Sequence, residues 1–322
     1  MRAGIPPMVH LIQFTKRYGS QVAADCVELF VPEGEVFGLI GHNGAGKTTI
    51  FNFLATLLPP TSGGGRVCGY DVVRFYREVR QLVGFMPDHF GVYPGMVVEQ
   101  FLRFFAKAHG LSRSETGVVI DDILQLVDLA AVRAAPVDTL SRGMRQRLCL
   151  GRALIHNPRV LILDEPASGL DPRARREMRD LIRTLAGMGK TILISSHILS
   201  ELGDVCTSIG FLNRGHLVQT GTLEEILGAV RPHRVFLVEW VGPAEPILEA
   251  LNNQPAVRNV VEPTPTARGT FQTGFQLEAD NATVAAIHAD MVRRGGQIVQ
   301  FDEQEVDLEE AFLQVTDSYG TA

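Results

Sequence analysis

A short strand, a glycine-rich turn and a helix follow one another between residues 36 and 58. Val36–Ile40 is an apolar run suited to a buried strand, Gly41–Gly46 contains three glycines, and an apolar helical pattern begins after Lys47. Glycines let backbone N–H groups converge on an anion, and the positive end of the helix dipole points at the same place. The spacing Gly-x4-Gly-Lys-Thr, which ends at Thr48, therefore predicts a loop that binds nucleotide phosphates.

Two side chains at the end of this loop have the chemistry that phosphate binding requires. Lys47 adds a mobile cation for the β- and γ-phosphates, and the Thr48 hydroxyl is a hard oxygen ligand suited to Mg²⁺. The alternative is a glycine-rich turn that binds nothing, and the flanking strand and helix argue against it.

A second strand ends in two carboxylates. Val160–Leu163 is a run of aliphatic residues followed by Asp164 and Glu165. A buried parallel strand delivers the residues at its carboxyl end into the crevice where ligands of open α/β sheets bind. Asp164 is placed to hold Mg²⁺ or its water, and Glu165 to polarise a water for attack on the γ-phosphate. The alternative interpretation of this pair is a helix or turn cap.

Three further features favour the same chemistry but also have simpler explanations. Tyr18 precedes the glycine-rich loop and could either stack on a nucleotide base or pack within the fold. Ser141 and Gly143 open a helix whose N-terminus suits an anion, although a serine N-cap alone explains them. His197 follows the strand Thr191–Ile194, where it could sense a γ-phosphate or be structural.

Composition narrows the class of protein. The 322 residues suffice for about two domains, and the net charge of −6 argues against a broad basic surface for nucleic acid. Residues 231–322 hold 6 basic and 14 acidic residues, a net charge of −8, whereas residues 1–230 carry a net charge of +2. The four cysteines lack metal-binding spacing and are expected to be small buried residues. No apolar run approaches the roughly 18 residues of a membrane span, so we expect a cytosolic protein that reaches a membrane through a partner.

We expect two domains, residues 1–230 and residues 231–322. In the first, strands that alternate with helices predict a mostly parallel sheet, with a helical insertion at about residues 90–150 and a further strand at Arg66–Tyr70. The second domain is expected to be a compact α+β module. Its predicted elements are the strands Val235–Trp240, Val257–Val261, Phe271–Leu277 and Gln297–Phe301 and the helices Pro246–Leu251, Ala282–Arg294 and Asp307–Leu313.

Five motifs together resemble a known family. The segments GHNGAGKT, LSRGM, LILDEP, SGLD and SSH occur in this order within residues 8–230, as they do in the nucleotide-binding domain of the ATP-binding-cassette (ABC) superfamily. The resemblance implies the P-loop NTPase fold of the α/β class. That fold joins a mostly parallel sheet to antiparallel strands and a helical subdomain, and here a small C-terminal α+β domain follows it.

The resemblance also implies roles for the matching residues. Glu165 is the catalytic base, His197 is the switch histidine and Lys47 binds the phosphates. Thr48, Asp164 and Asp88 serve the metal ion, Asp88 directly or through a water. The nucleotide contacts that the family implies are Tyr18 for adenine, the phosphate loop Gly41, His42, Asn43, Gly44, Ala45, Gly46, Lys47, Thr48 and Thr49, the γ-phosphate reporter Asp88, and the signature loop Ser141, Arg142 and Gly143.

Three positions depart from the common family pattern. Arg142 stands where the signature usually has a glycine, Met144 stands where it has a glutamine, and Asp88 stands where the family has glutamine or glutamate. The LSRGM form and the acidic residue after Pro87 are similar to one branch, the ATPases of two-component exporters. In that branch a separate membrane protein supplies the channel for drugs, lipids, polysaccharides or ions.

The family mechanism implies that two copies pair head to tail, so that the phosphate loop of one and the signature loop of the other clamp the same ATP. The expected function is a magnesium-dependent ATPase subunit of an ABC exporter, a homodimer at the inner face of the cell membrane that drives an integral membrane permease. One alternative is a soluble ABC ATPase that acts on a ribosome or DNA, and another is an ATP-binding switch without turnover. The single cassette, the acidic tail and the presence of both Glu165 and His197 argue against these alternatives, and no nucleic-acid partner is expected.

Overall fold

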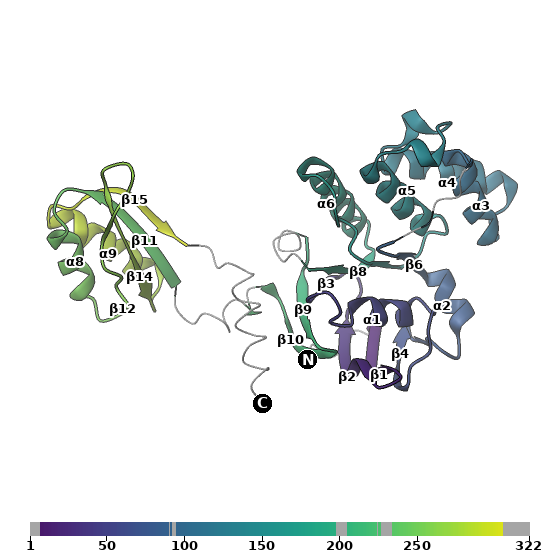
Figure 1. Cartoon of the computed structure of the whole chain (residues 1–322), viewed down its shortest axis with the longest axis horizontal. Helices are drawn as coiled ribbons and strands as arrows, with labels where there is room; N and C mark the ends of the chain where they lie inside the picture. The colour runs from purple at the N-terminus through teal and green to yellow at the C-terminus, as the bar shows by residue number, and fades with distance from the viewer. Residues whose placement is uncertain are drawn as a thin grey trace. The chain divides into compact units, whose positions relative to one another are not determined.

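The computed structural model describes residues 7–89, 91, 95–197, 205–223, 225–226 and 234–304. These residues form two compact units that divide between residues 224 and 225 (Figure 1). The predicted boundary between residues 230 and 231 and the predicted final helix Asp307–Leu313 lie outside the described residues.

A six-stranded sheet forms the centre of the first unit, with the strand order β10-β9-β3-β8-β7-β6. All neighbours are parallel except β9 and β10, which confirms the prediction of a mostly parallel sheet. The carboxyl ends of its parallel strands therefore meet at one edge, where α/β proteins bind ligands. The strands are β3 (Val36–Ile40), β6 (Val83–Met86), β7 (Val160–Leu163), β8 (Thr191–Ser196), β9 (Ser208–Asn213) and β10 (His216–Gly221).

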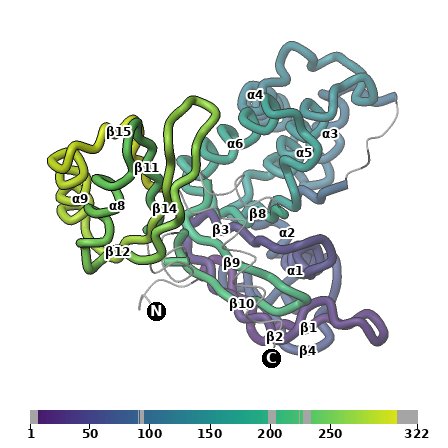
Figure 2. Tube along the Cα trace, turned by 60° about the vertical axis from the view of Figure 1, so that its left-hand side comes forward, coloured from purple at the N-terminus to yellow at the C-terminus, as the bar shows by residue number. Residues whose placement is uncertain are grey.

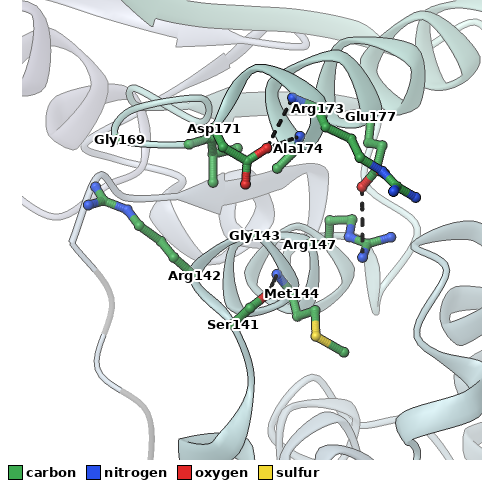
Figure 3. Close-up of a pocket in the computed structure, with 11 residues that line it drawn as sticks. Ser141, Arg142, Gly143, Met144, Arg147, Gly169, Asp171, Arg173, Ala174 and Glu177 are labelled. Carbon is green, nitrogen blue, oxygen red and sulfur yellow. Dashed lines mark hydrogen bonds and ion pairs between the residues drawn. The ribbon is translucent and has the colours of Figure 1, made fainter.

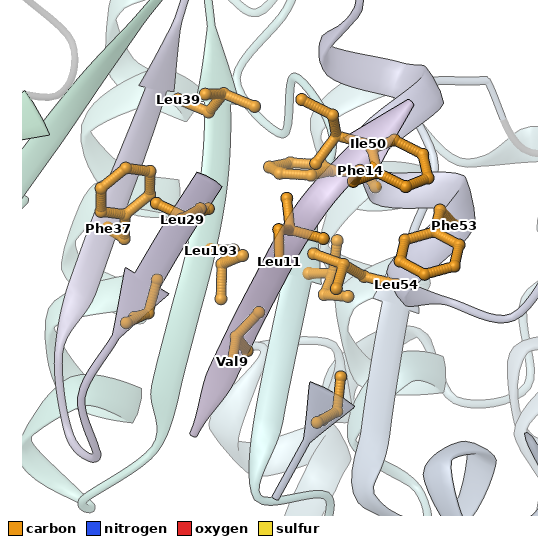
Figure 4. Packing of buried hydrophobic residues seen from close by; sticks show 14 of the residues in the cluster. Val9, Leu11, Phe14, Leu29, Phe37, Leu39, Ile50, Phe53, Leu54 and Leu193 are labelled. Atoms are coloured by element: carbon orange, nitrogen blue, oxygen red, sulfur yellow. The ribbon is translucent and has the colours of Figure 1, made fainter. Parts of the chain in front are cut away.

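A second, antiparallel sheet has the order β2-β1-β4-β5, from β1 (Val9–Tyr18), β2 (Gln21–Val31), β4 (Ser62–Val67) and β5 (Tyr70–Asp71). Helix α1 (Lys47–Leu54) packs on it through one buried apolar cluster, in which the rings of Phe14 and Phe53 stack with centroids 4.3 Å apart (Figure 4). This cluster also takes in side chains of β3 and β7, so it joins the two sheets.

Two predictions for the first unit are wrong, the second of them only in part. The predicted strand Arg66–Tyr70 is interrupted, because Cys68 and Gly69 both have positive φ values, 50° and 82°, and turn the chain between β4 and β5. The four cysteines are free thiols, but only Cys149 is buried and Cys26 is exposed.

A helical insertion follows β6 in the chain. It contains α3 (Val98–Ala108), α4 (Arg113–Leu126), the short 3₁₀ turns η1 (Ala130–Val132) and η2 (Val137–Thr139), and α5 (Arg142–Leu154), and α3, α4 and α5 form one group in Figure 1. Helix α4 begins with a capping box between Ser112 and Glu115. Outside the insertion are α6 (Pro172–Gly187) and α2 (Tyr76–Leu82), of which α2 was not predicted.

The second unit is a five-stranded antiparallel sheet with two helices on one face (Figure 2). Its order, β12-β14-β11-β15, together with the sequence β-α-β-β-α-β, is the ferredoxin-like arrangement. The core lies between sheet and helices around Trp240 and Phe275. The elements are β11 (Arg234–Val241), α8 (Glu245–Asn252), β12 (Val257–Arg258), β13 (Thr264–Pro265), β14 (Phe271–Leu277), α9 (Asn281–Arg293) and β15 (Gln297–Glu303). Strand β12 is shorter than predicted, and β13, which pairs with β14, was not predicted.

Among the helices that the structure describes, none combines the length and the apolar character that crossing a membrane would take.

Candidate active site

The phosphate loop has the geometry that its sequence predicts. All of β3 is buried, and the loop that leaves it enters α1 at Lys47. Gly44 and Gly46 adopt left-handed backbone conformations, with φ values of 82° and 113°. At Gly46 a Cβ atom would also lie 2.1 Å from the carbonyl oxygen of Ala23, so any side chain there would displace the neighbouring β2 strand. At this position the loop therefore packs directly against backbone, and only glycine fits.

Lys47 is only 5% exposed and lies between the loop and the carboxylates. Its Nζ donates a hydrogen bond to the Gly41 carbonyl oxygen at 2.5 Å, and it lies 3.3 Å from Oε1 of Glu165. A buried ammonium group needs such partners, since desolvation is costly for an unpaired charge. The lysine of the loop and the carboxylate after β7 thus belong to one site.

Asp164 is almost fully buried, with 1% exposure, and it has one oxygen without a partner. Its Oδ1 accepts a hydrogen bond of 2.6 Å from Ser195 Oγ, whereas Oδ2 has no hydrogen-bond partner in the described structure. Burial raises the pKa of Asp164, while hydrogen bonds from Ser195 and Thr48 act in the opposite direction. A buried carboxylate oxygen beside a threonine hydroxyl fits a hard divalent cation such as Mg²⁺.

Both the backbone and the side chain of Glu165 make contacts that fix its position. Its backbone has a φ of 49°, which is uncommon for a residue other than glycine, and its N–H donates to Ser195 Oγ at 2.9 Å. Its Oε2 lies 2.8 Å from Nδ1 of His197. The structure therefore brings together the three predicted catalytic residues, Lys47, Glu165 and His197.

Asp88 lies two residues beyond β6, on the same sheet edge as the other carboxylates. The N–H of Asp164 donates to the Met86 carbonyl oxygen at 2.8 Å, which holds the ends of β6 and β7 side by side. The negative charge of Asp88 contributes to the raised pKa of Asp164, so the two carboxylates are within electrostatic range. Oδ2 of Asp88 lies 2.8 Å from Nδ1 of His89.

Tyr18 ends β1 and is 50% exposed. The ammonium group of Lys16 lies 5.3 Å from the centre of its ring. The partner strand β2 reaches the phosphate loop at Ala23, so the ring projects from a hairpin that contacts this loop. An exposed aromatic face in this place is available for stacking on a base.

The predicted signature residues lie in a different place from the phosphate loop. Ser141 is the N-cap of α5, and its Oγ accepts a hydrogen bond from the Met144 N–H at 3.2 Å. Ser141, Arg142 and Gly143 line a pocket of about 330 Å³ together with the loop that follows Glu165 and the start of α6 (Figure 3). No residue of the phosphate loop lines this pocket.

Sequence reasoning missed two contributions to the site. Ser195 bridges Asp164 and Glu165 and had no predicted role, although a hydroxyl at the end of β8 was a visible signal. Gln146 donates to the Ser168 carbonyl oxygen at 3.2 Å, a contact that no spacing indicates.

The fold and the site define a class. A glycine-rich phosphate loop at the end of β3 and an Asp-Glu pair at the end of β7, on one edge of a mostly parallel sheet, make the first unit a P-loop nucleotide-binding domain.

Comparison with known proteins narrows the class to a family. The family model "ABC transporter" matches residues 24–168. The probable multidrug ABC transporter ATP-binding protein YbhF of Escherichia coli is 38% identical over 214 residues, which cover 66% of this chain but 37% of YbhF. The Nod factor export ATP-binding protein I of Burkholderia pseudomallei is 33% identical over 304 residues, 94% of this chain and 95% of the relative. A solved ATP-binding subunit of an ABC transporter matches 68% of this chain and 91% of its own, with a TM-score of 0.62 and 29% identity.

The chain therefore belongs to the ATP-binding proteins of the ABC transporter family, and its first unit is an ATPase domain of the ABC type. It spans little more than a third of YbhF but nearly all of the Nod factor export protein.

Proposed function

We propose that this chain is the ATP-hydrolysing subunit of an ABC exporter and that Glu165 is its catalytic base. One observation carries the proposal: Lys47 and His197 contact the two carboxylate oxygens of Glu165 from opposite ends, at 3.3 and 2.8 Å. A binding site without turnover needs no such placement of a carboxylate beside the phosphate-loop lysine.

In this mechanism the Glu165 carboxylate orients a water for in-line attack on the γ-phosphate and accepts its proton. His197 holds one carboxylate oxygen and fixes the direction of the other. Lys47, between Glu165 and the phosphate loop, stabilises the negative charge that develops on the phosphate oxygens. The γ-phosphate leaves as inorganic phosphate and ADP remains.

Thr48, Asp164 and Asp88 are the residues that would hold Mg²⁺. The unpartnered Oδ2 of Asp164 and the nearby Thr48 hydroxyl support this assignment, and Asp88 would act directly or through a water. When bound, Mg²⁺ neutralises charge on the β- and γ-phosphate oxygens. Tyr18 would stack on the adenine.

We further propose a head-to-tail homodimer. Two helix starts suited to anions, α1 and α5, serve separate places in one chain, and the α5 pocket contains none of the phosphate-loop residues. A two-fold axis would place the signature loop of one copy over the phosphate loop of the other, so that two ATP molecules lie between the copies.

The names of the relatives, a multidrug transporter subunit and a Nod factor export protein, support an export role with a separate membrane permease. The chain would then be cytoplasmic and peripheral to the membrane. Among its described residues, the ferredoxin-like second unit has no group of His, Cys, Asp or Glu side chains that could hold a metal ion. We propose that residues 231–322 form an accessory domain.

Purification of the Glu165→Gln variant with ATP from gently solubilised membranes tests this function. We expect an integral membrane protein in a fixed ratio to the chain, and its loss when Lys47→Ala is added as a control. Recovery of ribosomes, DNA or a soluble factor, with no membrane protein, would contradict the exporter function. It would indicate an ABC ATPase that acts on a macromolecule.

A further inference from the structure

Arg142, which replaces the usual signature glycine, is hydrogen-bonded within its own chain. Its Nη2 donates to the Ser168 carbonyl oxygen at 2.9 Å. Gln146, one helical turn further along α5, donates to the same oxygen at 3.2 Å. Two side chains on one face of α5 thus hold one carbonyl group of the loop that follows Glu165.

The next residue of that loop, Gly169, is shaped to accept this arginine. Its φ is +64°, and a Cβ atom there would lie 2.3 Å from Cζ and 2.4 Å from both terminal nitrogens of Arg142. Three nearly equal distances mean that the flat face of the guanidinium lies over Gly169. Figure 3 shows Arg142 extending from the start of α5 toward the loop that carries Gly169.

The held carbonyl belongs to the turn that positions Glu165. The Ser168 N–H donates to the Glu165 carbonyl oxygen at 3.0 Å, so Ser168 is bonded to Glu165 on one side and to Arg142 on the other. The positive φ of Glu165 is a strained conformation that persists only when its surroundings hold it. Arg142 supplies part of that support from α5.

We propose that Arg142 is a positioning residue for Glu165 of its own chain. Its main contact is therefore the loop after Glu165, and not the nucleotide bound to the partner copy. The inference rests on the proposed function. The usual glycine has no side chain to make this link, so this chain couples the start of its signature helix to its own catalytic base. Loss of the link moves the base and leaves the phosphate loop as it is, so it should change kcat and not KM.

Steady-state kinetics give the first test. Loss of a hydrogen bond to the supporting loop predicts that Arg142→Ala lowers kcat about fivefold to tenfold with little change in KM for ATP. Arg142→Lys should recover little, because an ammonium group lacks the planar face that covers Gly169. Arg145→Ala removes the same charge from the same turn of α5 and serves as the matched control. If lysine restores the parental kcat, charge is sufficient and the positioning role is wrong.

Hydrogen exchange gives a readout that needs neither turnover nor nucleotide. Amides of residues 165–171 should exchange faster in full-length Arg142→Ala than in the parental chain or in Arg145→Ala. Unchanged exchange in this segment contradicts the proposal even if the parental chain proves inactive as an ATPase. Absence of parental ATP turnover would contradict the proposed function alone.

Heterodimers of differently tagged full-length chains distinguish support within one chain from contact across the dimer. One heterodimer carries Arg142→Ala and Glu165→Gln in the same chain, and the other carries them in opposite chains. In the first, the remaining Glu165 keeps its own Arg142, and turnover should match a heterodimer with Glu165→Gln alone. In the second, turnover should fall about fivefold to tenfold. The reverse pattern would show a contact to the partner's nucleotide and would overturn the proposal.

Discussion

The starts of α1 and α5 are both suited to anions, but their surroundings differ. Around α1, Lys47 and Asp164 are 5% and 1% exposed, and their charged groups are already arranged for phosphate chemistry. Around α5, Ser141 and Arg142 are exposed and Arg173 projects a side chain that is 89% exposed. Around α1 the charges lie in a low-dielectric environment, where electrostatic interactions are stronger than in water. The region around α5 has the open surface expected of a half-site that a partner completes.

Among effects on nucleotide binding, the largest that this comparison predicts is at Lys47. Lys47→Ala removes the buried cation that contacts both the phosphate loop and Glu165, so we expect ATP affinity to fall by at least about a hundredfold. Isothermal titration calorimetry measures the affinity for ATP. Lys190→Ala serves as the control, because Lys190 pairs with Asn157 and not with the phosphate loop. Comparable ATP binding by Lys47→Ala and the control would contradict the assignment.

Glu165→Gln separates binding from chemistry at the same site. The amide keeps the size of the carboxylate but cannot accept a proton, so hydrolysis should fall by about 10²- to 10³-fold. ATP affinity should stay within about twofold, since the phosphate loop is untouched. Phosphate release and equilibrium binding measure the two effects, and parental turnover by this variant would mean that another group is the base.

Ser195→Ala tests the bridge between the two carboxylates. The hydroxyl donates to Asp164 Oδ1 and accepts from the Glu165 N–H, so its removal leaves two buried polar groups without a partner. We expect about a tenfold loss of kcat and a higher Mg²⁺ concentration for half-maximal activity. An unchanged Mg²⁺ dependence would show that Ser195 does not orient Asp164.

Much of the α1 site could be predicted because its residues follow strands in the sequence. The buried runs before Gly41 and Asp164 indicate parallel strands, and parallel strands align their carboxyl ends. The contacts of Ser195 and Arg142 could not be predicted in this way, since they join residues 30 and 26 positions apart. The turn at Cys68 was missed because positive φ at a cysteine has no sequence signature.

Ser141→Ala tests the open half-site and should have a smaller effect on the free chain. It removes an N-cap, which is worth about 1 kcal/mol and lowers the unfolding temperature by roughly 2–4 °C. ATP binding to the separate chain should not change, whereas ATP-dependent pairing should weaken. Calorimetry and titration measure these effects, and a loss of ATP affinity equal to that of Lys47→Ala would show that the two regions form one site within a chain.

At neutral pH the smallest effect is that of His156, whose contribution to stability changes only in acid. His156 follows α5, stacks on His109 at 3.9 Å and donates from Nε2 to the Val83 carbonyl oxygen at 3.0 Å, so it joins the helical insertion to β6. Burial lowers the pKa of His156 to about 4. As the pH falls, His156 is therefore protonated in the unfolded chain before it is protonated in the folded chain. The free energy of unfolding decreases as the pH falls from about 6.5 toward 4, by up to about 3 kcal/mol. The denaturant midpoint of His156→Gln should decline less steeply with falling pH than that of the parental chain. An equal decline in the two proteins would contradict this role.

We propose above that each nucleotide site is completed by two copies of the chain, so the mass of the protein in solution should depend on ATP. Sedimentation of Glu165→Gln tests it directly, with and without ATP and Mg²⁺. We expect a monomer without ATP, a doubling of mass with ATP, and no doubling when Ser141→Arg is added to block the α5 pocket. A mass that does not change with ATP, or a dimer that tolerates Ser141→Arg, would contradict it.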